Sequence, residues 1–244
     1  MALDDENLPA ALSRMLALAQ ERNLDLDFHA DENDDPFSEA LRHIADAVLR
    51  HEFPGRVLCG HCCSLAVQPA ADVVETMARV KAAGLAVVSL PACNLYLQDR
   101  QPGRTPRWRG IPPLHELRAM GIPIAVGHDN CRDPFYPFGD HDLLAAWAIA
   151  VLVGHLTPSE WIGSITGTAA DLLGVDGGGT PGPRRAGGFC GVCGPLLRRI
   201  AGPSPKRSPG VSQRGRGDRT PPQLSPIDGI GAASAGCWSW ATTA

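Results

Sequence analysis

The sequence lacks the features that would place it at a membrane or on a nucleic acid. Its longest apolar run, Leu143 to Leu156, is too short to span a bilayer and predicts a buried helix. The net charge of −4 over 244 residues gives no general attraction for a polyanion. The first residues are acidic, whereas a signal peptide begins basic and apolar, so we expect a cytoplasmic protein with no membrane partner. Its eight cysteines are then expected to be reduced thiols or metal ligands.

What the sequence does contain, from residue 8 to about 174, is an alternation of amphipathic helical stretches with short apolar runs. The four runs are LDLDF, RVLCG, LAVVSLP and IPIAVG, and a helical stretch precedes each of them. This alternation predicts βα units on a parallel sheet, followed by helices at Leu143–Leu156 and Pro158–Leu173. A closed (β/α)8 barrel needs eight units. The predicted fold class is therefore α/β, as a partial TIM-type barrel of about four units that corresponds to its second half.

Polar side chains come at the end of each apolar run. They are His29 with Glu32, then His61, then Cys93 with Asn94, and finally His128 with Asp129. The carboxyl ends of parallel strands open onto one face of a sheet or barrel, where catalytic groups gather. The sequence therefore predicts one site at that face.

The segment His29-Ala-Asp-Glu32 suits metal-assisted hydrolysis. An imidazole binds a cation that acidifies water, and a carboxylate three residues later moves the protons. Asp129, directly after a strand, is suited to complete the metal shell and to accept a proton from the water. The alternatives are a solvated acidic loop with an incidental histidine at His29, and a helix cap or turn role for Asp129.

His61 lies in CGHCCSL and has two other interpretations. It is a satisfied core histidine among small buried thiols, or it neighbours a zinc site formed by Cys59, Cys62 and Cys63. The second interpretation lacks the paired ligand spacing of structural zinc sites. A CxxC pair at Cys190 and Cys193 has no second pair beside it.

The composition changes at about Val175. Residues 175–244 are rich in Gly, Pro, Ser and Arg and show no apolar periodicity, so we expect this tail to remain unfolded. Its basic character leaves weak RNA binding open. A frame shift near Ala186 is the interpretation we favour, because freely chosen synonymous codons for Gly187–Gly215, read one base later, can encode an apolar strand, a helical turn and a second strand.

The motifs FHADENDD, CGHCCSL, SLPACNLYLQDR with RTPRWRGIPPLHEL, and GHDNCRDPFYPFGD, in this order, resemble the bacterial cytosine deaminases of the amidohydrolase superfamily. The resemblance covers residues 8 to 174. It implies one iron or zinc ion held by His29 and Asp129, with Glu32 as proton shuttle. His61 and Asp129 would position and deprotonate the attacking water. Asn130 would contact a nucleobase-like substrate and Phe135 would cover it, and ammonia would be released.

The sequence departs from that family in three ways. It has no HxH motif, which supplies two further metal ligands on the first barrel strand of the family. It has Asn130 where members with a proven cytosine preference have Asp. It also offers nothing from which the small β-domain of the family could form. We therefore expect residues 1–174 to be the second half of a deaminase barrel, incomplete and inactive alone. A split enzyme with a separate N-terminal half, an inactive fragment and a binding module with a basic tail remain the alternatives.

Overall fold

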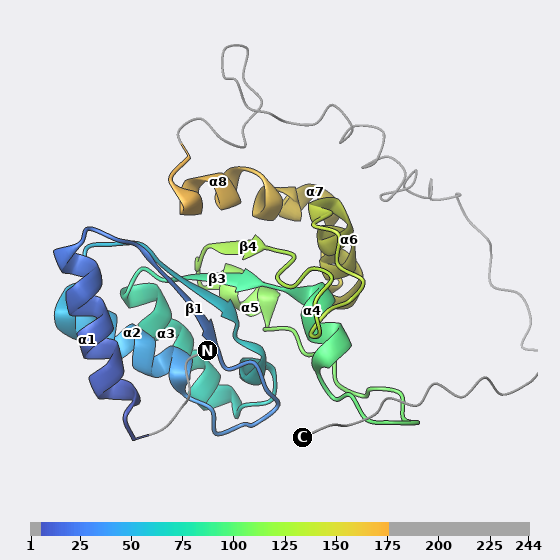
Figure 1. Cartoon of the computed structure of the whole chain (residues 1–244), viewed down its shortest axis with the longest axis horizontal. Coiled ribbons are helices and arrows are strands. Elements are labelled where there is room, and N and C mark those ends of the chain that lie inside the picture. Colours follow the sequence, from blue (N-terminus) through green and yellow to red (C-terminus); the bar gives the residue numbers. More distant parts are fainter. Residues whose placement is uncertain (1–5, 176–244) are drawn as a thin grey trace, which may run out of the picture. The chain divides into compact units, whose positions relative to one another are not determined.

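The computed structural model describes residues 6–175 of the chain (Figure 1). The expectations for the tail, namely an unfolded segment, RNA binding, a frame shift near Ala186 and the pair Cys190 and Cys193, lie outside these residues. Within residues 6–175, none of the helices has the length and apolar character needed to cross a membrane.

One sheet of four parallel strands forms the centre of the described part. The strands are β1 (Leu26–Ala30), β2 (Val57–His61), β3 (Ala86–Ser89) and β4 (Ile124–Val126). They are hydrogen-bonded in the order β1-β2-β3-β4, which is also their order along the chain. The carboxyl ends are aligned, since Ala30 pairs with His61 and Ser89 pairs with Val126. The predicted partial TIM-type barrel of about four βα units is confirmed.

Helices connect the strands and cover the sheet (Figure 1). In chain order they are α1 (Leu8–Glu21), α2 (Ala40–His51), α3 (Ala70–Ala82), α4 (Pro91–Leu97), α5 (Leu114–Ala119), α6 (Leu143–Gly154), α7 (Pro158–Trp161) and α8 (Gly167–Leu173). Two short 3-10 helices are η1 (Cys63–Ala66) and η2 (Ile162–Ile165). The region expected to be helical at Pro158–Leu173 is thus three short helical pieces in succession.

The helices form because apolar side chains recur at helical spacing and face the sheet. In α1 the residues Leu8, Leu12, Leu16 and Ala19 are all buried. In α2 the buried set includes Leu41, Ile44 and Val48, and the last turn has basic residues that favour a helix carboxyl end. These faces join the buried residues of the strands in one hydrophobic core.

Helix α6 differs from the expectation of a buried helix. Trp147 is 1% exposed and its indole Nε1 donates to the carbonyl of Trp161 at 3.2 Å. Leu152 on the same helix is 73% exposed. The described residues therefore cover only one face of this helix, because four βα units supply too little surface to enclose a helix that is apolar on all sides.

Candidate active site

His61 lies at the centre of the polar groups at the carboxyl ends of the strands. It is the last residue of β2 and its side chain is 1% exposed. Its Nδ1 lies 2.7 Å from Asn94 Oδ1 and 3.5 Å from Glu32 Oε1. Its Nε2 lies 3.0 Å from His29 Nδ1 and 3.8 Å from Asp129 Oδ2. Each of the four parallel strands thus contributes to the surroundings of one imidazole.

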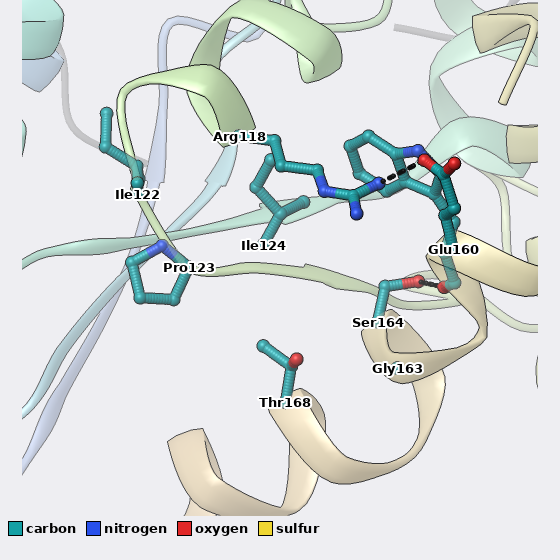
Figure 2. A pocket seen from close by; sticks show the side chains of 10 residues that line it. Arg118, Ile122, Pro123, Ile124, Glu160, Gly163, Ser164 and Thr168 are labelled. Atoms are coloured by element: carbon teal, nitrogen blue, oxygen red, sulfur yellow. Dashed lines mark hydrogen bonds and ion pairs between the residues drawn. The ribbon is translucent and has the colours of Figure 1, made fainter. Parts of the chain in front are cut away.

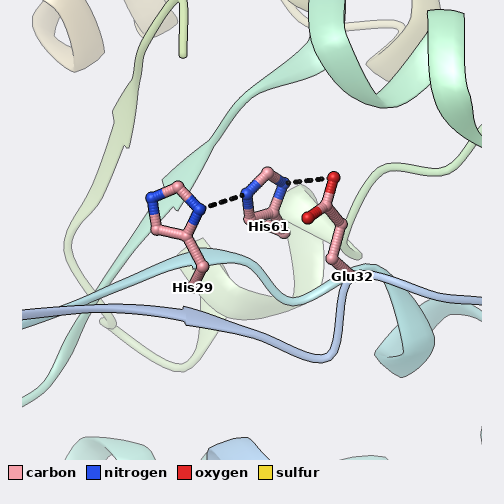
Figure 3. Close-up of side chains that lie close together, drawn as sticks. All are labelled: His29, Glu32 and His61. Atoms are coloured by element: carbon pink, nitrogen blue, oxygen red, sulfur yellow. Dashed lines mark hydrogen bonds and ion pairs between the residues drawn. The ribbon is translucent and has the colours of Figure 1, made fainter. Parts of the chain in front are cut away.

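His29, Glu32 and His61 form a group that could hold a metal ion. One ligand atom from each lies within 4.8 Å of the others, and the two imidazole rings meet edge to face with their centroids 4.7 Å apart. Figure 3 shows the three side chains converging, with His61 between His29 and the Glu32 carboxylate. His29 belongs to β1 and lies one residue before its end, so the strand itself delivers this side chain. The structure thus brings together His29 and Glu32, the two residues that the sequence predicted to act on one metal-bound water.

Asp129 follows β4 and approaches the group from the other side of His61. Its side chain is 11% exposed. It does not cap a helix; the cap of α6 is Asp142, whose carboxylate accepts from the backbone N–H groups of Leu144 and Ala145. The cap of α6 is therefore Asp142, whereas Asp129 is the candidate site residue.

Left-handed backbone recurs at these strand ends. His61 and Asp129 both have φ of 67°, and Asp31, between His29 and Glu32, has φ of 51°. Such values are uncommon for residues other than glycine, and they cluster at functional sites where the surrounding structure maintains the strain. These turns lie at or just after the ends of β1, β2 and β4.

Hydrogen bonds of Asp31 hold the first of these turns, at the end of β1, in place. Its carboxylate accepts hydrogen bonds from the N–H groups of Ala40 and Leu41, the first two residues of α2, at 3.0 and 2.9 Å. Its carbonyl accepts from Cys63 and Ser64 at 2.9 and 3.1 Å. Asp31 is 4% exposed. It therefore connects the segment that carries His29 and Glu32 to both α2 and η1, a role that the sequence alone did not reveal.

A cavity of about 430 Å³ opens beside this group. Its lining residues are His29, Glu32, Leu97, Gln98, Asp129, Asn130 and Phe135. Five of the six sequence-predicted site residues therefore face one space, and the sixth, His61, lies buried directly behind it. Sequence reasoning missed Leu97, the last residue of α4, and Gln98, which follows it. The Gln98 amide donates to the carbonyl of Glu32 at 3.1 Å.

The side chain of Asn130 is held by two neighbours. Its Nδ2 donates to Asp133 Oδ2 at 2.7 Å, and its Oδ1 accepts from the Cys93 thiol at 3.1 Å. Asp133 in turn accepts from the N–H groups of Phe135 and Tyr136 at 2.9 Å. These contacts hold the pKa of the Asp133 carboxyl below its usual value, chiefly through the N–H of Tyr136 and the amide of Asn130. The loop that carries Asn130 and Phe135 is thereby organised around one aspartate.

The thiols near the site are buried and donate hydrogen bonds to oxygen atoms. Burial raises the pKa of four of them, which we name the buried thiols: Cys59, Cys62, Cys63 and Cys93. Their hydrogen bonds run to oxygen acceptors; Cys63 donates to the carbonyl of Gly110 at 3.0 Å. Within residues 6–175 the one group suited to a metal contains no cysteine. The alternative of a zinc site formed by cysteines therefore finds no support in the described part.

The donor set fits a divalent metal. Imidazole nitrogens and carboxylate oxygens are the ligands of iron and zinc in hydrolytic sites. Around His61, the imidazole of His29 and the carboxylates of Glu32 and Asp129 provide both types. His29 and Asp129 remain the predicted ligands, and Glu32 and His61 lie beside them.

A second cavity, of about 290 Å³, lies at the opposite end of β4 (Figure 2). It is lined by Ile122, Pro123 and Ile124 at the amino end of that strand, and its polar rim contains the Arg118–Glu160 ion pair at 3.2 Å. Because the candidate site is at the carboxyl ends, this cavity takes no part in it.

Comparisons with known proteins agree with the fold and with the site motifs. The profile of the Amidohydrolase family matches residues 2–190. A pterin deaminase of Rhizobium rhizogenes (strain K84 / ATCC BAA-868) is 49% identical over 150 residues, which are 62% of this chain and 34% of that protein. The N-isopropylammelide isopropyl amidohydrolase of Pseudomonas sp. (strain ADP) is 24% identical over 179 residues, 72% of this chain and 41% of that protein.

Among solved structures, the 5-methylcytosine deaminase of Klebsiella pneumoniae with bound 5-fluorocytosine superposes with a TM-score of 0.67 at 25% identity. The superposition covers 74% of this chain and 45% of the deaminase. The chain thus spans between a third and a half of the length of the relatives that it matches. The resemblance to deaminases of this superfamily, drawn from four motifs, is confirmed.

Proposed function

The chain belongs to the amidohydrolase family, and from this premise we propose that it provides the carboxyl-terminal half of a metal-dependent deaminase of an aminated nitrogen heterocycle. The observation that carries the proposal is the convergence of His29, Glu32, His61 and Asp129 from three strand ends onto one cavity. In this proposal residues 1–174 are the half-barrel unit.

The reaction is hydrolytic. Water adds its oxygen to the amine-bearing ring carbon, the carbon–nitrogen bond breaks, and the nitrogen leaves as ammonia. A divalent ion held by His29 and Asp129, iron or zinc, supplies the acidification of water that the reaction needs near neutral pH. Every proton that the water loses must then reach the ring nitrogen or the leaving amine.

The side chains around the cavity are suited to move these protons. Glu32 lines the cavity and its side chain is 19% exposed, so its carboxylate has access to a ring nitrogen and then to the departing amine. His61 and Asp129 lie on the other side, where they would position the water and accept its proton. Phe135 lines the same cavity, is 59% exposed and would cover the heterocycle.

We propose that the substrate is a pterin-type ring and not cytosine. The relative with 49% identity is a pterin deaminase, whereas the 5-methylcytosine deaminase shares 25%. Asn130 supports the same choice, because members with a proven cytosine preference have Asp at that position. The amide of Asn130 already donates to Asp133 and accepts from Cys93, which leaves one N–H and one lone pair for the substrate. An adjacent donor and acceptor match the N–H and C=O of a lactam edge.

Because the chain spans less than half the length of these relatives, the test must supply the other half of the enzyme. We would co-express the full chain with a polypeptide comprising the first half of the Rhizobium rhizogenes pterin deaminase, add zinc or iron, and measure ammonia released from pterin, cytosine and guanine. We expect release from pterin to be the fastest, and no release by the chain alone. Glu32→Gln should lower the rate about 10²- to 10⁴-fold.

The matched control is Asp34→Asn, which removes an exposed carboxylate from the same loop and should leave the rate unchanged. Equal rates for Glu32→Gln and the control would contradict the assigned role of Glu32. A folded, metal-loaded complex that releases ammonia from none of these heterocycles would contradict the proposed function.

A further inference from the structure

A chain of buried hydrogen bonds runs from the Gly110 carbonyl to the imidazole of His61. The Cys63 thiol lies 3.0 Å from the carbonyl of Gly110, and its sulfur lies 3.1 Å from Asn94 Nδ2. Asn94 Oδ1 lies 2.7 Å from His61 Nδ1. Cys63, Asn94 and His61 are each 0% exposed, so these contacts have no competition from bulk water.

The chemistry of the first group sets the direction of every later bond. A carbonyl oxygen only accepts, so the Cys63 thiol must donate to Gly110. With its one proton committed, the sulfur only accepts, and the Asn94 atom facing it must be Nδ2. This fixes the orientation of the amide, whose oxygen and nitrogen have nearly the same shape and are assigned from their hydrogen bonds. The oxygen of Asn94 therefore faces His61.

We infer that Asn94, oriented by Cys63, is a positioning residue that keeps His61 in the tautomer with its proton on Nδ1 and its lone pair on Nε2. The Glu32 carboxylate oxygen at 3.5 Å is a second acceptor on the Nδ1 side and favours the same tautomer. Nε2 then accepts from His29 Nδ1 at 3.0 Å, while the Asp129 carboxylate, itself an acceptor, lies farther away at 3.8 Å. The inference rests on the proposed function and deepens it, since it fixes which nitrogen of His61 carries a proton and which carries a lone pair beside the cavity.

The direction of these hydrogen bonds also determines the tautomer of His29. Because His61 Nε2 accepts, His29 Nδ1 at 3.0 Å must donate, and the lone pair of His29 is then on Nε2. Figure 3 shows this second nitrogen on the side of the ring away from His61. Histidine ligands of metals are commonly fixed in one tautomer by the hydrogen bond of their other nitrogen. A backbone carbonyl in a distant loop thus determines which nitrogen of His29 a metal would meet.

The tautomer can be measured directly in the metal-free full chain, without substrate. Two-bond proton–nitrogen correlation spectra of the ¹⁵N-labelled chain, recorded above the usual pKa range of histidine, distinguish a protonated from an unprotonated ring nitrogen. The His61 signals are assigned by their loss in His61→Gln. We expect Nδ1 protonated and Nε2 unprotonated in His61, and the same in His29.

Three variants separate positioning from simple packing. Asn94→Leu removes the acceptor, so the His61 nitrogen shifts should move toward a mixture of tautomers. Asn94→Asp keeps an acceptor and should retain the Nδ1–H tautomer. Cys63→Ala frees the amide to rotate and should shift His61 in the direction of Asn94→Leu, by less.

The control is Cys62→Ala, an adjacent buried thiol that bonds only to the carbonyls of Cys59 and Gly60, and it should leave the His61 shifts unchanged. A wild-type His61 protonated on Nε2, or on both nitrogens, would overturn the inference. So would an unchanged His61 in a folded Asn94→Leu or Cys63→Ala chain. Because no ammonia is measured, failure of the deaminase proposal would not alter these results.

Discussion

Asp31→Ala tests whether one buried carboxylate holds the segment that carries His29 and Glu32. The side chain is 4% exposed and caps α2 through the N–H groups of Ala40 and Leu41, nine and ten residues further along the chain. Alanine leaves these two donors at the amino end of a helix without their partner. It also has to adopt the φ of 51° that aspartate and asparagine tolerate better.

The magnitude follows from those two bonds. Hydrogen bonds to a charged group each contribute about 1.5–3 kcal/mol, and removal of a helix cap costs about 0.5–2 kcal/mol when water can replace it. We expect the free energy of unfolding to fall by about 3 kcal/mol. With a urea dependence of about 2 kcal/mol per molar, the unfolding midpoint should fall by about 1.5 M. Asp31→Asn retains one acceptor and the backbone preference, so it should lose about half as much.

The assay is urea unfolding of the full chain, followed by circular dichroism. Asp35→Ala is the control, since Asp35 bonds to the N–H of Phe37 in the same loop but is exposed. Its free energy of unfolding should stay within about 0.5 kcal/mol of the wild type. Equal midpoints for Asp31→Ala and Asp35→Ala would refute the argument that Asp31 anchors the loop.

Further predictions concern the buried thiols and the Asn130 loop. Because burial raises the pKa of the buried thiols, the folded chain retains protons that the unfolded chain releases above the ordinary thiol pKa of 9.0. The free energy of unfolding should therefore fall as the pH rises through about 9, and urea midpoints that do not change with pH there would be inconsistent with this. Among the described cysteines, Cys131, which is partly exposed, should be alkylated first in the native chain, as read by peptide mass spectrometry; faster labelling of a buried thiol would contradict the burial. Asn130→Asp places a second carboxylate against Asp133 and should lower the unfolding midpoint, and adding Asp133→Asn should restore it; no recovery in the double variant would count against the contact.

Much of the fold could be predicted because it depends on short-range pattern. The four apolar runs predicted all four strands, and the rule that parallel strands deliver their carboxyl ends to one face predicted the meeting of His29, Glu32, His61 and Asp129. Helix α4 was missed, because Pro91 follows β3 so closely that the run LAVVSLP reads as one strand. A proline at the first helical position is in fact favourable.

The features that could not be predicted depend on hydrogen bonds between residues that are distant in sequence. The start of α2 at Ala40 is set by the carboxylate of Asp31, nine residues earlier. The orientation of His61 is set by Asn94, 33 residues later, and by Cys63. The acidic run after β1 therefore divides its roles among a helix anchor, a candidate proton shuttle and exposed carboxylates, so it is not a wholly solvated loop.

The measurement that tests the central claim most directly is the metal content of the full chain co-purified with the first half of the Rhizobium rhizogenes pterin deaminase. The account predicts one iron or zinc ion per complex, lost in His29→Ala and retained in His51→Ala, whose imidazole bonds to Ser13 on α1. A folded complex that holds no ion, or that holds it equally well after His29→Ala, would contradict the claim that the strand ends of this chain form a metal site.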